Sequence, residues 1–156
     1  MASDVISINL PDEAATDALA QRIAPHLLRG DCFLLEGAIG AGKTAFSRAL
    51  IRARLGRMED VPSPTFTLVQ EYEDPEGDIW HCDLYRLTYP DEAFELGLDD
   101  AFEHAICLIE WPDRLGSDQP TNASRLTFEA LANGHRVTIH LSDTMRPRLS
   151  GVVGFA

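Results

Sequence analysis

The sequence predicts a three-layer α/β fold, in which helices cover both faces of a mixed, mostly parallel central sheet. Three observations lead to this prediction. A glycine-rich loop, "GAIGAGKT" (37–44), lies between a short apolar run and a helical pattern. A second apolar run, "AICLIE" (105–110), indicates another buried strand. Turn sequences at 74–77 ("DPEG") and 133–134 ("NG") each join strand-like segments, which is typical of antiparallel hairpins.

The N-terminal third supplies a strand, a helix and a second strand. Residues 5–10 alternate between apolar and polar, as a half-buried strand does. Residues 12–28 follow a helical period, with Leu19, Ile23 and Leu27 on one stripe. The run "CFLLE" (32–36) is continuously apolar until its last residue and suits a buried parallel strand.

After the glycine loop, a second helical period begins at Lys43 and places Phe46, Leu50 and Ile51 on one side. Gly56 indicates the end of this helix. The remaining elements that we expect are a hairpin from 66–73 and 78–87, a helical or turn-rich stretch at 90–103, the buried strand at 105–110, and a second hairpin from 124–132 and 135–141. We therefore expect one domain over 1–141, followed by a flexible tail over 142–156 that shows no periodicity.

The loop at 37–44 fits the phosphate-binding pattern of Gly, four residues, and Gly-Lys-Ser/Thr, so the domain is predicted to be a P-loop NTPase. Loop glycines let consecutive N–H groups converge on phosphate oxygens, and the helix N-terminus adds its positive dipole end. Lys43 would reach the outer phosphates and the Thr44 hydroxyl would bind Mg²⁺. Lys43 is also the one lysine among thirteen basic residues. The alternative is a glycine-rich turn before an ordinary helix. The residues expected to contact the nucleotide here are Gly37, Ala38, Ile39, Gly40, Ala41, Gly42, Lys43, Thr44 and Ala45.

Two acids at strand ends are candidates for the metal and the attacking water. Mg²⁺ prefers oxygen ligands and usually takes a carboxylate from a neighbouring strand. Glu110 ends the apolar strand at 105–110, and Asp83 follows the largely apolar run "IWHC". Two such acids beside a Lys-Thr pair suit phosphoryl chemistry, with one acid at the metal and the other orienting water. The alternative for each is a strand-end residue that caps the next element.

Other candidates rest on weaker patterns. The segment "VPSPTFT" (61–67) is stiff because its prolines fix φ, and Thr65 could supply a hydroxyl to the metal or the γ-phosphate. The alternative is a rigid entry into an edge strand. His81 is interpreted as a packed histidine rather than a ligand. Glu13 and Arg136 are proposed for adenine or ribose contacts, although no motif fixes them.

Charge and cysteine content narrow the function classes. The net charge of −12 argues against direct nucleic-acid binding as the main activity, because phosphate contacts need a basic face. The stretch between Arg86 and Arg114 is acidic, and is either a solvated helix face or a docking surface for a basic partner. The three cysteines lack metal-ligand spacing, which favours buried, reduced thiols. With no leader-like start and no apolar run of membrane-span length, we expect a soluble, cytoplasmic protein without a membrane partner.

Four segments in this order and spacing resemble the TsaE family, also called YjeE. They are "GAIGAGKTAFSRALIRARLG", "SPTFTLVQEY", "HCDLYRL" and "ICLIEWPDRL". The similarity runs from about Leu10 to Leu141, and the second and third segments are much more specific than the phosphate loop alone. The family comprises small P-loop ATPases of the bacterial machinery that makes N6-threonylcarbamoyladenosine in tRNA.

The resemblance implies ATP and Mg²⁺ as cofactors, and it implies docking on the TsaB–TsaD pair, which ATP hydrolysis resets between turnovers. tRNA would be reached only indirectly. Thr44 and Glu110 would be the Mg²⁺ ligands, Asp83 would be important for hydrolysis, and Trp111 would be the tryptophan typical of the family. Two alternatives stay open: a P-loop kinase of small molecules, and a nucleotide-gated scaffold that does not turn over.

Overall fold

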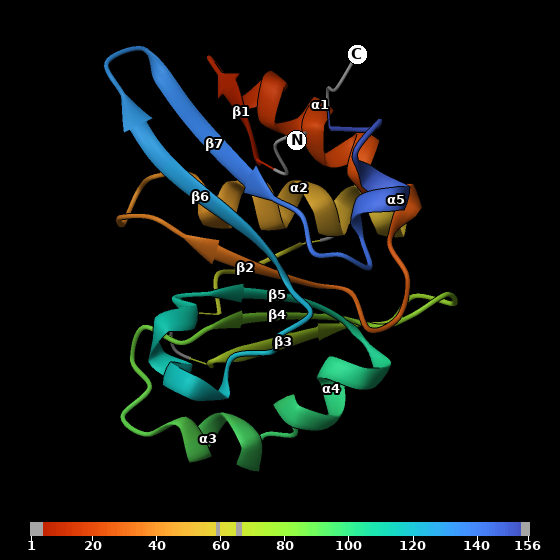
Figure 1. Ribbon diagram of the computed structural model, residues 1–156, viewed down its shortest axis with the longest axis vertical. Helices are drawn as coiled ribbons and strands as arrows, with labels where there is room; N and C mark the ends of the chain where they lie inside the picture. The colour runs from red at the N-terminus through yellow and green to blue at the C-terminus, as the bar shows by residue number, and fades with distance from the viewer. Residues whose placement is uncertain (1–4, 59, 65–66, 154–156) are drawn as a thin grey trace.

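The computed structural model describes residues 5–58, 60–64 and 67–153, whose strands form one sheet in the order β1-β7-β6-β2-β5-β4-β3 (Figure 1). The four central strands, β6, β2, β5 and β4, pair in parallel, whereas β3, β7 and β1 pair antiparallel at the two sides. The strands are β1 (Val5–Leu10), β2 (Cys32–Glu36), β3 (Val69–Tyr72), β4 (Ile79–Asp83), β5 (Ile106–Glu110), β6 (Ser124–Leu131) and β7 (Gly134–His140). The predicted mixed sheet with its two hairpins is confirmed.

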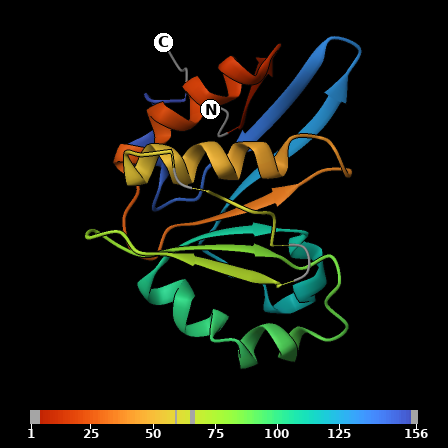
Figure 2. The ribbon, with the colours of Figure 1, turned by 180° about the vertical axis from the view of Figure 1, so that it is seen from behind.

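Helices cover both faces of the sheet (Figures 1 and 2). On one face lie α1 (Glu13–Ile23), its 3-10 extension η1 (Ala24–His26) and α2 (Lys43–Leu55); on the other lie α3 (Pro90–Glu95) and α4 (Leu98–His104). The helix predicted over 12–28 is shorter than expected, because Pro25 lacks an N–H group and the chain tightens into η1 there. None of the helices within the described ranges combines the length and the apolar character that crossing a membrane requires.

Alternation along β4 and β5 decides which way the two candidate acids face. Ile79, Ile106 and Leu108 belong to the core under α1 and α2, whereas Cys82 and Ile109 belong to the core under α3 and α4. Successive side chains of a strand point to opposite faces. Asp83 and Glu110 therefore share the face of β4 and β5 that α2 covers.

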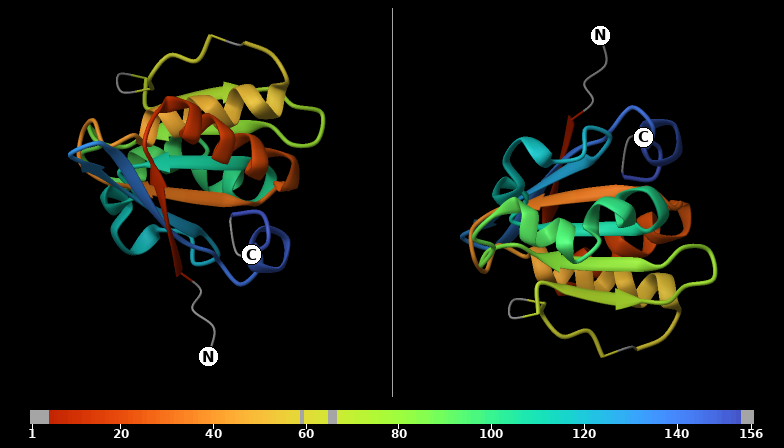
Figure 3. Two further views of the ribbon diagram at one scale, coloured as in Figure 1. Left: turned by 90° about the horizontal axis from the view of Figure 1, so that it is seen from above. Right: turned by 90° about the horizontal axis from the view of Figure 1, so that it is seen from below.

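The segment after β7 packs on the body of the molecule, which differs from the expected flexible tail. Its short helix α5 (Arg146–Leu149) lies beside the loop before β2 (Figure 3). Met145, Leu149 and Val153 are buried in the α1–α2 core, and Arg148 forms a two-bond ion pair with Asp31. These three apolar residues recur every fourth position, but one helical turn is too short for a periodic pattern to be recognised.

Candidate functional site

The site forms at the edge of the sheet where the carboxyl ends of β2, β5 and β4 meet the start of α2 (Figure 1). The loop between β2 and α2 needs glycine at two positions. Gly37 and Gly42 have φ of 141° and 111°, and a Cβ at Gly37 would overlap the backbone of Phe128. No side chain among the described residues caps the first turn of α2, which leaves its N–H groups as donors for an anion.

The Lys43 ammonium lies inside this site rather than in solvent. Nζ lies 3.7 Å from the centre of the Trp111 ring and donates a hydrogen bond to the carbonyl of Gly37. Burial lowers the pKa of Lys43, and the carboxylates of Glu110, Asp83 and Asp113 oppose this shift. An aromatic face and three acids thus offset part of the effect of burial on the cation.

Glu110 connects α2 to β4. Its Oε1 accepts a hydrogen bond from the Thr44 hydroxyl at 2.8 Å, and its Oε2 lies 2.6 Å from Nε2 of His81. His81 and Glu110 are almost completely buried. A hydroxyl and a carboxylate at the mouth of a phosphate loop are the hard oxygen donors that Mg²⁺ prefers. The structure brings Thr44 and Glu110 together, and their role as metal ligands stays a prediction.

Asp83 lies beside Glu110 on the neighbouring strand, in register with it. Its carboxylate accepts a hydrogen bond from the backbone N–H of Tyr85 at 3.0 Å. The Tyr85 ring packs on Trp111, with centroids 4.9 Å apart, and Trp111 adopts a left-handed backbone with φ of 59°. Such a conformation is costly for an aromatic residue and clusters at functional sites. Asp83, Tyr85 and Trp111 thus form the wall opposite the glycine loop.

These side chains enclose a cavity of about 450 Å³, and a second hollow of about 250 Å³ adjoins it at Gly42, Ala45 and His135. The first is lined by Ile39, Gly40, Gly42, Lys43, Thr44, Ala45, Asp83, Tyr85, Arg86, Glu110, Trp111 and His135. The second is lined by Leu10, Pro11, Asp12, Glu13, Thr16, Gly42, Ala45, Phe128, Gly134 and His135.

Most of the predicted site residues line these two spaces, with five exceptions. Gly37 lies behind the cavity wall, where its carbonyl accepts a hydrogen bond from Lys43. Ala38 and Ala41 close the turn of the loop, where Ala41 N–H donates to Ala38 O. Arg136 lies on β7, where it pairs with Glu129 instead of entering either space. Thr65 lies outside the described residues. Glu13, in contrast, lines the second hollow.

Sequence reasoning missed two histidines at the site. His81 was interpreted as a packing residue, yet it contacts Glu110; its position two residues before Asp83 places both on one face of β4. His135 is the second residue of β7, and its Nε2 lies 3.3 Å from the Gly40 carbonyl. Only the pairing of β7 with β6 and β1 brings this residue to the loop, so the local pattern carries no sign of it.

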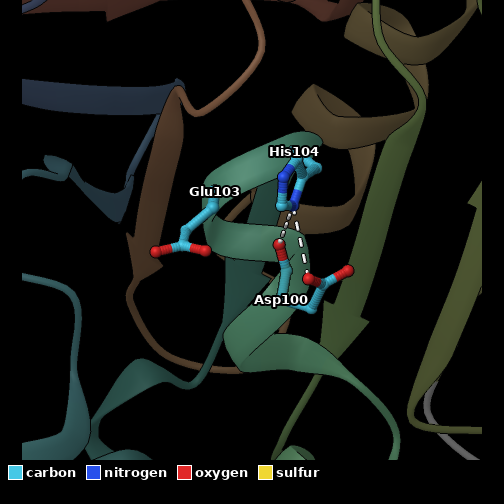
Figure 4. Close-up of side chains that lie close together, drawn as sticks. All are labelled: Asp100, Glu103 and His104. Carbon is cyan, nitrogen blue, oxygen red and sulfur yellow. Dashed lines mark hydrogen bonds and ion pairs between the residues drawn. The ribbon is translucent and has the colours of Figure 1, made fainter.

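A second group of metal-type ligands lies on α4, where Asp100, Glu103 and His104 are all exposed (Figure 4). His104 Nδ1 lies 3.3 Å from Asp100 Oδ1 and 3.1 Å from the Asp100 carbonyl, one turn earlier in the same helix. These contacts are local to the end of α4, and they account for the position of the histidine.

Comparisons of the sequence with a family model and with known proteins all point to one family. The family model for the threonylcarbamoyl adenosine biosynthesis protein TsaE matches residues 10–138. The chain is 38% identical over 128 residues to the "tRNA threonylcarbamoyladenosine biosynthesis protein TsaE" of Rickettsia bellii, covering 82% of this chain and 89% of that one. It is 35% identical to the protein of the same name from Bacillus subtilis, covering 81% and 77% of the two chains.

A solved structure agrees with these sequence matches. The crystal structure of YdiB from Bacillus subtilis superposes with a TM-score of 0.79 at 26% identity, covering 95% of this chain and 93% of that one. The matched region contains the phosphate loop, both strand-end acids and the Trp111 wall. The chain therefore belongs to the TsaE family of threonylcarbamoyl adenosine biosynthesis proteins.

Proposed function

We propose that this protein binds ATP with Mg²⁺ and hydrolyses it during N6-threonylcarbamoyladenosine formation in tRNA, acting on TsaB–TsaD to reset that pair between turnovers. The observation that carries the nucleotide part is the 2.8 Å contact between the Thr44 hydroxyl and the Glu110 carboxylate, beside an uncapped helix start and a glycine loop. Such an arrangement suits a Mg²⁺–nucleotide.

Each described site residue has a proposed role that fits its position. The loop and first turn, 37–45, hold the phosphates through backbone N–H groups, and Lys43 adds positive charge at the outer phosphates. Thr44 and Glu110 hold Mg²⁺, which neutralises phosphate charge when bound. Asp83 orients the attacking water and accepts its proton. Thr65, which lies outside the described residues, stays proposed as a hydroxyl for the metal or the γ-phosphate.

The second hollow offers a place for the base or ribose. It adjoins the phosphate cavity, and Glu13 on its wall offers a carboxylate to a ribose hydroxyl or a base amino group. The position of Arg136 gives no support to the contact proposed for it, because its side chain pairs with Glu129 away from both spaces.

The partner role rests on the family and on charge. The relatives from Rickettsia bellii and Bacillus subtilis are named as tRNA threonylcarbamoyladenosine biosynthesis proteins. A chain with a net charge of −12 is a poor direct ligand for tRNA, so its effect on tRNA would pass through proteins in the cytoplasm.

The test is ATP hydrolysis by the purified chain, alone and with TsaB and TsaD. We expect slow turnover alone, stimulation by the pair, and loss of turnover when EDTA removes Mg²⁺. Label moving from ATP to a metabolite would instead indicate a small-molecule kinase. Hydrolysis near zero both with and without the partners would indicate a nucleotide-gated scaffold.

A further inference from the structure

His81 is a buried polar side chain with one partner. It lies on β4 with no exposed surface, and its Nε2 lies 2.6 Å from Glu110 Oε2. Across residues 5–58, 60–64 and 67–153, its other ring nitrogen, Nδ1, has no hydrogen-bond partner. Among its hydrogen bonds within the described residues, the ring is therefore anchored at one nitrogen only, and that nitrogen is directed at Glu110.

The Glu110 carboxylate is held by two donors that differ in freedom. The Thr44 hydroxyl bonds Oε1, and it can rotate about its C–O bond to present a lone pair elsewhere. The His81 ring bonds Oε2 from the interior of a central parallel strand, where packing fixes its orientation. When the Thr44 hydroxyl rotates toward a cation, its hydrogen bond to Glu110 is lost, whereas the one from His81 can remain.

Charge strengthens the contact between His81 and Glu110. An ionised carboxylate can only accept hydrogen bonds, so Nε2 of His81 is the donor to an ionised Glu110. A donor to a carboxylate makes a stronger hydrogen bond than one to a neutral acceptor. A carboxylate with 2% of its side chain exposed would lose much of its solvation without such a donor. A leucine would fill this buried position equally well, so packing alone does not explain a histidine here.

We propose that His81 is the positioning residue of the metal site: its ring fixes the Glu110 carboxylate so that Oε1 stays directed at Thr44. This inference rests on the proposed role of Glu110 in holding Mg²⁺. Groups that hydrogen-bond a metal ligand orient it, and their loss typically weakens metal affinity by about 10–100-fold.

The experiment measures metal binding rather than turnover. Mn²⁺, as a paramagnetic probe for Mg²⁺, is titrated into the full chain with a non-hydrolysable ATP analogue, and free Mn²⁺ is followed by electron paramagnetic resonance. His81→Leu fills the buried space without a donor, whereas His81→Gln keeps an N–H at similar reach. Ile79→Val is the matched control, because it lies on the same face of β4 and in the same core but does not contact Glu110.

We expect Mn²⁺ affinity to fall about 10–100-fold in His81→Leu and to be largely restored in His81→Gln. Ile79→Val should bind Mn²⁺ like the parent, and binding of the analogue in EDTA should be unchanged in all three. If His81→Leu binds Mn²⁺ like the parent while Glu110→Gln binds it more weakly, His81 is only a packing residue and the proposal is wrong. Parent-like affinity in Glu110→Gln would instead overturn the metal site itself, and this inference with it.

A second measurement avoids substitution at His81, in case His81→Leu does not fold. In protein labelled with ¹⁵N-histidine, adding Mg²⁺ to the complex with the analogue should shift the ring resonances of His81, while exposed His140 stays unchanged. A His81 resonance that does not respond to Mg²⁺ would also overturn the proposal.

Discussion

Lys43 is a buried residue whose ammonium group has an aromatic ring and acids as neighbours. Its ammonium lies over the Trp111 ring and near the acids that the site already holds. The Lys43→Ala variant loses a charge-assisted contact to the outer phosphates, worth about 1.5–3 kcal/mol, so ATP hydrolysis should fall by about 10–100-fold or more. Steady-state phosphate release measures this. Arg22→Ala, an exposed change at the end of α1, should behave like the parent. Normal turnover by Lys43→Ala would remove the phosphate-loop assignment.

Asp83 and Glu110 lie side by side, yet we expect their substitutions to impair different steps. Asp83→Asn keeps the shape of the side chain and loses its charge, so ATP should still bind through the loop at 37–44. Hydrolysis should fall by about 10²-fold or more, the usual size of a lost general base. Calorimetric ATP binding together with phosphate release tests both parts. Hydrolysis at the parent rate would show that Asp83 only caps its strand, and loss of binding would place it in the fold or at the metal.

Glu110→Ala should raise the Mg²⁺ concentration needed for activity, because the Thr44 hydroxyl then lacks its acidic neighbour. Activity measured across a Mg²⁺ series gives the midpoint. An unchanged midpoint would assign the metal to other residues.

At the scale of elements, the Asp31–Arg148 pair fastens α5 to the start of β2. The two bonds are 2.7 and 2.8 Å long, and the hydrogen bonds to Asp31 raise the pKa of Arg148. Arg148→Ala should lower the free energy of unfolding by about 2–3 kcal/mol, since it leaves the buried Asp31 carboxylate without its charged partner and with only the Leu28 N–H as a donor. Urea unfolding measures this, and Arg146→Ala in the same helix is the control, because the carboxylate that it bonds, Asp143, is exposed. Equal stability of the two variants would contradict the role given to the pair.

Three buried thiols on adjacent strands give the core a pH dependence. Burial raises the pKa of Cys107 to about 12 and places those of Cys32 and Cys82 well above their usual value. The folded state thus keeps protons that the unfolded chain releases, so stability should fall as pH rises above about 9, toward the raised folded-state pKa. Urea unfolding at several pH values tests this. Native protein at pH 8 should resist alkylation, and fast labelling would show that these thiols are accessible.

The elements that could be predicted are those with a local pattern. Alternation, apolar runs and two turn sequences were sufficient for the strands, and the glycine loop located one wall of the site. The features that could not be predicted depend on pairing between distant parts of the chain. His81 contacts Glu110 only because β4 and β5 lie in register, and His135 reaches the loop only through β7. The segment at 142–153 is ordered by burial and by Asp31, which lies far away in the sequence.

At the scale of the whole molecule, one sheet edge brings together residues from the N-terminal, middle and C-terminal parts of the chain. The parallel centre of the sheet carries the glycine loop and both acids, while the hairpin of β6 and β7 brings His135 to the site. This architecture suits a component that binds a nucleotide and changes a partner. The net charge of −12 argues against direct tRNA binding as the main activity.

The most direct measurement is tRNA modification by TsaB and TsaD, with the threonylcarbamoyl donor supplied, under single-turnover and multiple-turnover conditions. We expect the parent chain to support many cycles, and Asp83→Asn to support the first cycle and then stall while still docking to the pair. Multiple turnover with Asp83→Asn at the parent rate, or without this chain at all, would contradict the claim that its ATP hydrolysis resets the complex.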